Sequence, residues 1–322
     1  MEAEYDFYPE KPQLAEPKAK GNLALTIFSI VLFILTFLLV FTEEASFVFN
    51  LVIVLIIHEM GHFISMKVFG YQHVRMLFIP LMGAFVQGSK EEYSQRQSLI
   101  VAGAGPFPGI FIGLLLLYFA DVYHNPWMMD LAFLFLLLNI INLIPLDPLD
   151  GGQLFKLLIK VNHDLFLLIF TFVSSLVLIG FGWYIDSWVM MAFGFFMAFR
   201  VRTIQNQYYL RRELKNEGVN YRTTYKLLSN KDYAQIKLVL LDRIPNLRSF
   251  VENVDSEQAD PIMASQVNSV LLSPVRKDAS YLFRVILILL WLAVLSLPFV
   301  FIANLDFFVS RYEWWIELIE AR

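Results

Sequence analysis

The sequence contains no cysteine. This absence excludes disulfide-stapled scaffolds and thiolate metal sites, so a bound metal ion would have to be held by histidine, aspartate or glutamate. Charged residues are also scarce, because only 17% of the 322 residues are Asp, Glu, Lys or Arg and the net charge is −4. Such a chain lacks the positive surface that binding to nucleic acid requires, and we expect no nucleic acid partner.

Hydrophobic residues, by contrast, are abundant. They make up 57% of the chain, and phenylalanine alone occurs 31 times. This balance is typical of a polytopic membrane protein. The first 21 residues are polar and contain prolines, unlike the basic start and apolar core of a cleavable signal peptide. We interpret residues 1–21 as a flexible cytosolic segment.

Apolar segments predict seven helices that cross the bilayer, since about 20 apolar residues span its hydrocarbon core. The sixth has only a dozen apolar residues, so we expect six to seven transmembrane helices in an all-α polytopic membrane protein. We assign a transmembrane core to residues 22–201. The seven segments are residues 22–41, 47–69, 98–120, 128–144, 165–185, 188–199 and 281–303.

Lysine and arginine mark alternate connecting loops. They occur in the N-terminal segment and after the second and fourth spans, whereas the loops at 42–46, 121–127 and 186–187 have none. The positive-inside rule therefore predicts a cytosolic N-terminus and, with seven spans, a C-terminus outside. We expect a multi-pass protein of the plasma (inner) membrane.

Residues 202–280 are mainly polar and lie between the sixth and seventh spans. Helical periodicity in residues 232–244 and 256–272 favours a small helical cap over the cytosolic mouth of the core. A loosely ordered linker is the alternative. Residues 304–322 contain two adjacent tryptophans and are expected to lie at the membrane interface.

A different pattern occupies residues 70–97. Pro80 and Gly83 argue against a spanning helix there, and β-branched and aromatic residues alternate with other residues around them. We expect a short membrane-associated β-hairpin, or a loop that dips into the interface.

The second span carries the motif His58-Glu59-Met60-Gly61-His62. Residues four apart lie on one face of a helix, so both imidazoles can bind one metal ion. In zinc hydrolases with this pattern, the glutamate acts as general base on a zinc-activated water. Ionisable residues are costly inside a membrane, which favours a functional site over ordinary hydrogen-bonded core histidines.

Asp150 is the predicted third ligand, because a catalytic zinc ion has three protein ligands and one open position. It follows the fourth span, where Pro145 and Pro148 break the helix and two glycines permit a tight turn. Asp147 is the competing ligand. A further alternative is that Asp150 only caps the helix that begins near Gln153.

These two parts together resemble the site-2 protease family of intramembrane zinc metalloproteases. The match consists of residues 58–62 in one span and of Asn142-Leu143-Ile144-Pro145 through Asp150-Gly151 in a later one. Their order and separation are more specific than the first motif alone. The resemblance covers a catalytic part at about residues 45–160.

The resemblance implies a role for each matching residue. His58, His62 and Asp150 would bind one Zn²⁺ ion, and Glu59 would be the catalytic acid and base. Asn142 would lie near the site and hydrogen-bond the substrate backbone or the developing oxyanion. Packing between membrane helices is the alternative role of Asn142.

The resemblance also implies a function, which is cleavage of the transmembrane segments of single-span proteins. Cleavage would occur inside the bilayer near its cytosolic side, as in regulated intramembrane proteolysis. A substrate helix has to unwind first, because its carbonyl groups are engaged in hydrogen bonds. The hairpin edge at residues 74–87 would hold the unwound strand by β-augmentation, with Phe78 and Val86 as substrate-binding residues.

Two other functions are alternatives. A metal or proton transporter also uses broken helices and intramembrane polar residues, although it has no need for a glutamate directly after the first histidine. A catalytically inactive relative that binds membrane helices is the second alternative, and the intact motif argues against it.

Overall fold

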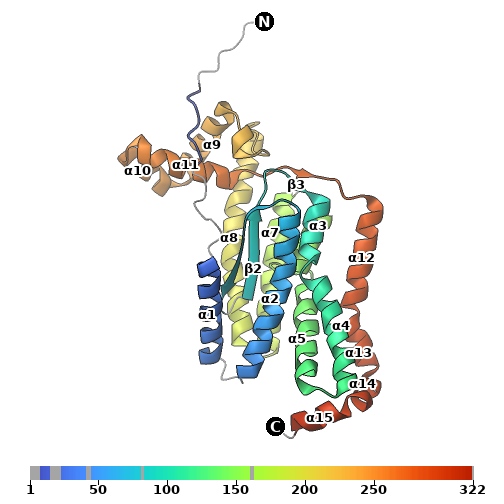
Figure 1. Ribbon diagram of the computed structural model, residues 1–322. Coiled ribbons are helices and arrows are strands. Elements are labelled where there is room, and N and C mark those ends of the chain that lie inside the picture. Colours follow the sequence, from blue (N-terminus) through green and yellow to red (C-terminus); the bar gives the residue numbers. More distant parts are fainter. Residues whose placement is uncertain (1–7, 15–22, 41–44, 81–82, 160–162, 321–322) are drawn as a thin grey trace.

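The computed structural model describes residues 8–14, 23–40, 45–80, 83–159 and 163–320. Much of the predicted N-terminal segment therefore lies outside the described residues. The fold is mostly helical. Long helices form a bundle with a β-hairpin at one side, and smaller helices lie above one end of the bundle (Figure 1).

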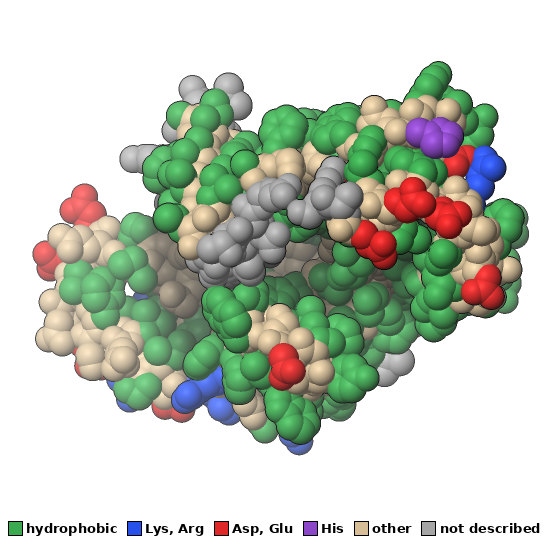
Figure 2. Space-filling view, turned by 90° about the horizontal axis from the view of Figure 1, so that it is seen from below, with side chains coloured by type: hydrophobic (Ala, Val, Ile, Leu, Met, Phe, Trp, Pro, Cys, Tyr) green, Lys and Arg blue, Asp and Glu red, His purple; other side chains and the backbone are tan. Residues whose placement is uncertain are grey.

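The length and composition of the helices identify a multi-pass integral membrane protein. Among the described residues, four helical segments are long and apolar enough to cross a membrane: residues 45–68, 95–123, 164–184 and 281–303. Two shorter apolar helices accompany them. Seen from below, hydrophobic side chains cover much of the molecule and charged ones are scattered among them (Figure 2). The count of seven spans stays a prediction.

The chain begins with two apolar helices, α1 (Leu23–Val40) and α2 (Ala45–Val68). It then forms the predicted hairpin from the antiparallel strands β1 (Gln72–Ile79) and β2 (Gly83–Ser89). Gly83 has a φ of +96°, a conformation that glycine adopts without the strain a side chain would bring. The Pro-Gly signal in the sequence thus marks the turn.

Helix α1 covers the outer edge of β1. The Thr26 hydroxyl donates to the Met76 carbonyl oxygen at 2.9 Å, and the Phe78 amide donates to the Ser29 hydroxyl at 3.1 Å. These bonds occupy backbone groups of β1 that another strand would need. Within the described part of the chain, the edge of the hairpin that α1 leaves uncovered is therefore the edge of β2. The strand β2 itself packs against α2.

The next part of the chain is interrupted twice. After the short strand β3 (Tyr93–Ser94), the predicted third span consists of α3 (Gln95–Gly103) and α4 (Pro106–Tyr123). The break occurs because the proline at the start of α4 cannot continue the hydrogen bonding of α3. Helix α5 (Pro126–Asn142) then ends in an irregular loop, and α6 (Asp150–Leu158) follows.

Helices α7 (His163–Tyr184) and α8 (Trp188–Asn216) form an antiparallel pair. The Ser175 hydroxyl donates to the Gly194 carbonyl oxygen at 3.0 Å across this pair. Helix α8 is longer than α7, at 29 residues against 22. It therefore runs on from the bundle into the region above it.

Residues 202–280 contain the small helices above the bundle, and we call this region the cap. It comprises η1 (Tyr225–Leu227), α9 (Asn230–Arg243), α10 (Pro245–Asn253) and α11 (Ser256–Val270), together with the end of α8. Helices α9 and α11 occupy the two segments with helical periodicity. Their apolar faces form one buried cluster with the end of α8, so the cap is folded around its own core.

Polar contacts tie the cap to the bundle and to the N-terminal segment. The Arg211 guanidinium in α8 pairs with Asp164 in α7 at 2.9 Å and also donates to the Val270 carbonyl oxygen in α11. The Lys11 ammonium donates to the Tyr225 carbonyl oxygen at 2.8 Å. The described N-terminal residues and the cap therefore lie on the same side of the bundle.

The C-terminal part returns along the bundle. Strand β4 (Val275–Arg276) pairs with β3, and α12 (Tyr281–Leu295) and α13 (Leu297–Ala303) then run away from the cap. Helices α14 (Leu305–Arg311) and α15 (Glu313–Glu320) lie at the opposite end of the molecule (Figure 1). Residues 8–14 and α15 are thus at opposite ends of the bundle.

Candidate metal centre

The two motif histidines lie side by side in the interior. His58 and His62 leave the same face of α2, with 3% and 7% of their surface exposed. Their Nε2 atoms are 3.2 Å apart. The spacing of four residues therefore produces the predicted pair, with both Nε2 atoms directed to one point.

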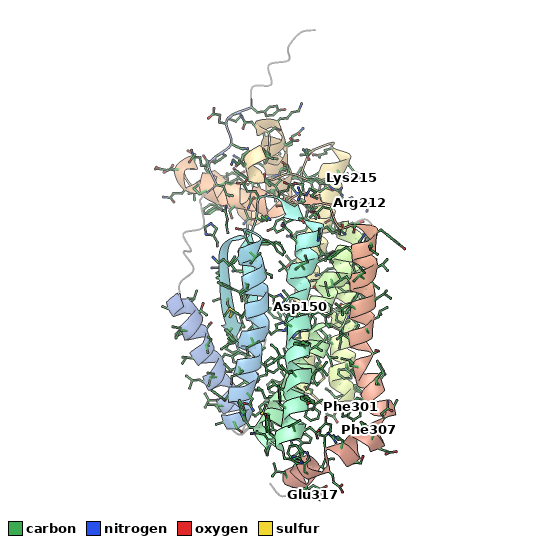
Figure 3. The ribbon with its side chains drawn as sticks, turned by 45° about the vertical axis from the view of Figure 1, so that its right-hand side comes forward. Asp150, Arg212, Lys215, Phe301, Phe307 and Glu317 are labelled. Carbon is green, nitrogen blue, oxygen red and sulfur yellow. The ribbon has the colours of Figure 1, made fainter. Side chains whose placement is uncertain are left out.

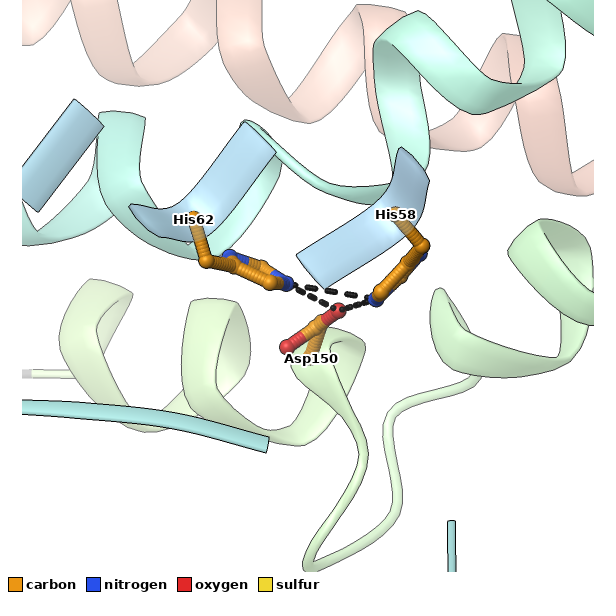
Figure 4. Close-up of side chains that lie close together, drawn as sticks. All are labelled: His58, His62 and Asp150. Carbon is orange, nitrogen blue, oxygen red and sulfur yellow. Dashed lines mark hydrogen bonds and ion pairs between the residues drawn. The ribbon is translucent and has the colours of Figure 1, made fainter. Parts of the chain in front are cut away.

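Asp150 completes this group. Its Oδ2 atom is 3.1 Å from the Nε2 atom of His58 and 3.1 Å from that of His62 (Figure 4). These residues form a cluster that could hold a metal ion. Asp150 is the first residue of α6, and the N-cap position belongs to Leu149. Asp150 therefore does not act as the N-cap, which was the alternative to its role as a ligand.

The hydrogen bonds on the far sides of the rings define the tautomers. Nδ1 of His62 is 2.8 Å from the Val101 carbonyl oxygen, which can only accept. Nδ1 of His58 is 2.7 Å from Oδ1 of Asn139, whose amide nitrogen donates to the Phe135 carbonyl oxygen. Both Nδ1 atoms are therefore donors. In the neutral rings, both Nε2 atoms carry lone pairs.

The residues fit a zinc ion. Two nitrogen lone pairs and a carboxylate oxygen that face each other at 3.1 to 3.2 Å would repel one another without a shared cation. In a tetrahedral zinc site with bonds of about 2.0 to 2.1 Å, neighbouring ligand atoms lie roughly 3.3 Å apart. The observed spacing matches this geometry, and one His-His-Asp set leaves the fourth position open.

Glu59 lies next to the ligands. Its side chain projects from α2 beside His58 and His62, and only 5% of its surface is exposed. The backbone N–H of Val86 in β2 is a hydrogen-bond partner of its carboxylate. The hairpin thus positions the group that the sequence predicts as acid and base.

A cavity of about 730 Å³ opens onto this group. Its walls come mainly from α2, β2, α3, the end of α5, one face of α6 and the first half of α8. In Figure 3, Asp150 lies well inside the length of the bundle, between Arg212 and Lys215 near the cap and Phe307 toward the other end. Asp150 therefore lies within the length of the bundle and not at either of its ends.

The predicted substrate-binding residues have different positions. Asn142 and Val86 line the cavity. One amide hydrogen of Asn142 is directed to the Leu138 carbonyl oxygen at 3.1 Å, which leaves a second one. Phe78 is not part of the described cavity wall, because it is 2% exposed and its ring packs edge-on against Phe33 of α1. The structure therefore brings together Asn142 and Val86 but not Phe78.

Glycines let the break between α3 and α4 approach the ligands. A Cβ atom on Gly105 would overlap Nε2 of His62 and lie 2.9 Å from Nε2 of His58. A Cβ atom on Gly61 would overlap the Ala104 carbonyl oxygen. Both positions require glycine, because a side chain would collide with backbone at Gly61 and with the two imidazole rings at Gly105.

Asp147, the competing ligand, points away from the histidines. Its carboxylate is fully buried, accepts from Lys156 at 2.7 Å and from Thr171 at 3.0 Å, and lies 3.4 Å from Arg200. Its backbone N–H donates to the Ser174 hydroxyl. Asp147 therefore fastens the loop that carries Asp150 to α7 instead of binding the metal.

Sequence reasoning missed the residues that orient the rings. Asn139 and the Val101 carbonyl group hold the two histidines, and Gly105 forms the adjacent wall. A polar residue on an apolar helix was a signal for Asn139, three residues before the predicted Asn142. The sequence contains no comparable signal for a backbone carbonyl.

A comparison with known protein families matches the part of the chain that carries His58 and His62. The model of peptidase family M50 matches residues 46–129. A zinc metalloprotease of Methanocaldococcus jannaschii is 29% identical over 143 residues, which is 43% of this chain. The match spans 37% of the length of that relative. The solved site-2 protease of the same organism aligns with 22% identity and a TM-score of 0.43, over 55% of this chain and 87% of that one.

Proposed function

We propose that this chain, which belongs to peptidase family M50, the site-2 protease family, cleaves transmembrane segments of single-span proteins inside the bilayer. The observation that carries the proposal is the complete ligand set of His58, His62 and Asp150, buried beside Glu59 at the wall of a cavity within a bundle of apolar helices. Such a cavity gives a polypeptide access to ionisable groups inside the membrane.

Zinc is the metal that this donor set favours. When bound, it polarises a peptide carbonyl group and makes water nucleophilic near neutral pH. Glu59 accepts the proton of the attacking water and passes it to the leaving amine. Asn139 and the Val101 carbonyl group keep the two imidazoles in the tautomer that leaves Nε2 free to ligate.

Asn142 binds the substrate in this proposal. Its side chain is in the cavity wall, and its second amide hydrogen can donate to the substrate backbone or to the oxyanion that develops during attack. Asn142→Leu should lower kcat by about 100-fold at unchanged zinc content. A kcat within a few-fold of the wild type would remove Asn142 from this role.

Strand β2 presents the substrate to Glu59. Because α1 covers β1, an unwound substrate strand adds to β2, whose residues from Gly83 to Gly88 line the cavity. The proposal thus rests on Val86 and no longer on Phe78. Val86→Pro removes the backbone donor that bonds Glu59 in this structure and that an added strand would also need, so it should abolish cleavage, whereas Val86→Ala keeps the donor. Equal cleavage by the two variants would exclude strand addition at this position.

The N-terminus and the cap are cytosolic in this proposal, and cleavage occurs near that side of the plasma (inner) membrane. Two observations support the orientation. Loops that carry lysine and arginine alternate along the chain with loops that carry neither. Lys11 from the N-terminal segment also contacts Tyr225 in the cap, so both belong on one side.

One experiment separates the protease from its alternatives. The full-length chain is purified, its zinc content is measured, and cleavage of an apolar model segment is compared between the wild type and Glu59→Gln. We expect one zinc ion per chain in both, and cleavage by the wild type alone. His58→Ala and Asp150→Ala should lose the metal. Zinc transport into liposomes without cleavage would favour a transporter, and equal cleavage by the wild type and Glu59→Gln would refute the role of Glu59.

A further inference from the structure

Helix α8 forms a cavity wall that is apolar and then basic. Phe193, Phe196, Met197 and Arg200 line the cavity at the spacing of one helical face. Along α8, Arg200 is the member of this set nearest to the cap. Apart from the groups at the metal centre, Arg200 is the charged residue in the described lining of the cavity.

The positive charge of Arg200 is not fully balanced by its neighbours. Asp147 is fully buried and already accepts a 2.7 Å hydrogen bond from Lys156 on one oxygen and a 3.0 Å bond from Thr171 on the other. The guanidinium of Arg200 lies 3.4 Å from the second oxygen. Two cations thus share one carboxylate, which leaves a net positive charge at this end of the cavity.

Exposure distinguishes the two cations. The side chain of Lys156 is 9% exposed, whereas that of Arg200 is 44% exposed. Among the described residues, Asp147 is the acidic residue that pairs with Arg200. An arginine has five N–H donors in a planar fork that matches a carboxylate. Arg200 can therefore pair with Asp147 and still present donors to a second carboxylate in the cavity.

We propose that Arg200 binds a carboxylate of the substrate. The inference rests on the proposed proteolytic function and deepens it. The cavity then selects a segment whose apolar residues lie along Phe193 and Phe196 and whose carboxylate follows toward the cap. This carboxylate is either an acidic side chain or the C-terminus of the segment.

The same charge disfavours a common class of membrane segment. Lysine and arginine are frequent at the cytosolic ends of membrane helices, and such a residue would meet the positive charge of Arg200 in a poorly screened setting. The simpler explanation of Arg200, as a partner that only neutralises Asp147, predicts no dependence on the charge of the substrate.

The test uses the full-length, zinc-loaded protein in liposomes. The peptides share one apolar segment and have amidated C-termini. Each carries one Asp, Asn or Lys, and the position of this residue beyond the cap-facing end of the segment is varied. A further peptide ends after the segment, with either a free or an amidated C-terminus. The variants are Arg200→Gln, Arg200→Lys and, as a neighbour outside the described cavity wall, Arg202→Gln.

We expect the wild type and Arg202→Gln to prefer the carboxylate by roughly 10- to 100-fold in kcat/KM, mainly through KM, since hydrogen bonds to charged groups are the strong ones. Arg200→Gln should lose this preference while it still cleaves the Asn peptide, and Arg200→Lys should keep part of it. A preference for Asp identifies a side chain as the source, and a preference for the free C-terminus identifies the chain end.

Each failure has its own meaning. Equal kcat/KM for the Asp, Asn and terminal peptides in the wild type would overturn the inference, and so would a preference that persists in Arg200→Gln. Turnover of the Asn peptide that depends on Glu59 would leave the proposed function intact in either case. If the wild type cleaved none of the peptides, the proposed function would fail and the inference with it. If Arg200→Gln does not fold, Arg200→Lys is compared with the wild type on the Asp and Lys peptides. A smaller preference for Asp in Arg200→Lys supports the inference, and an equal preference overturns it.

Discussion

Asn139 should control zinc affinity although it does not touch the metal. Its Oδ1 atom accepts a 2.7 Å hydrogen bond from Nδ1 of His58, in a pocket where His58 is 3% exposed. Replacement by leucine leaves this donor buried without a partner, at a cost of about 1 to 3 kcal/mol. At 1.4 kcal/mol per tenfold, this corresponds to roughly a 5- to 150-fold weaker zinc affinity. The range agrees with the roughly 10- to 100-fold effects of lost partners of metal-bound histidines.

The assay is competition for zinc with a chelator of known affinity, carried out on the purified full-length chain. Asn139→Asp keeps an acceptor toward His58 and should stay near the wild type, whereas Asn139→Leu should not. A Cβ atom on Gly109 would overlap the amide of Asn139, so Gly109→Ala should weaken binding by displacing the same partner. Gly180 has nothing within 4 Å of its Cβ position, which makes Gly180→Ala the matched control.

The reasoning would be refuted if Asn139→Leu bound zinc within about twofold of the wild type, because the predicted loss is several-fold larger. Equal losses in Gly109→Ala and Gly180→Ala would also contradict it. In that case the effect would come from substitution within an apolar helix and not from the partner of His58.

Three further predictions concern other parts of the molecule. Gly105→Ala should abolish zinc binding, measured as metal content, because its methyl group would overlap the ligating nitrogen of a histidine, while Gly180→Ala keeps the metal. Arg211→Met should lower the free energy of unfolding by about 3 to 5 kcal/mol, because it strands the buried charge of Asp164, and the double variant with Asp164→Leu should recover most of it in denaturant titrations. Hydrogen bonds from a backbone amide and a serine hydroxyl at the start of α3 lower the pKa of Asp278 to about 2. The contribution of Asp278 to the free energy of unfolding is complete above about pH 4 and is lost as the pH falls through about 2. Between these two pH values, the free energy of unfolding of Asp278→Asn should therefore depend less on pH than that of the wild type.

The chemistry of the centre could be predicted from the sequence where local rules apply. Two histidines four residues apart share a helix face, and this rule alone predicted that His58 and His62 lie close together. Proline and glycine signals identified the turn of the hairpin and the broken end of α5 that delivers Asp150. Apolar periodicity identified α9 and α11 in the cap.

Other features depend on contacts between distant elements. The choice between Asp147 and Asp150 was decided by Lys156 on α6 and Thr171 on α7, which draw the Asp147 carboxylate away from the histidines. Phe78 looked like a candidate for substrate binding because a strand pattern does not tell which edge is covered. Its position against α1 follows from tertiary packing, which no local pattern contains.

The central claim is that the chain hydrolyses a peptide bond inside an apolar segment, with Glu59 as acid and base. The most direct test places a single-span substrate and the zinc-loaded chain in liposomes and determines the masses of the products. We predict that the wild type produces two fragments whose junction lies inside the apolar segment, and that zinc-loaded Glu59→Gln produces none. A junction outside the apolar segment, or the same fragments from both proteins, would contradict the account.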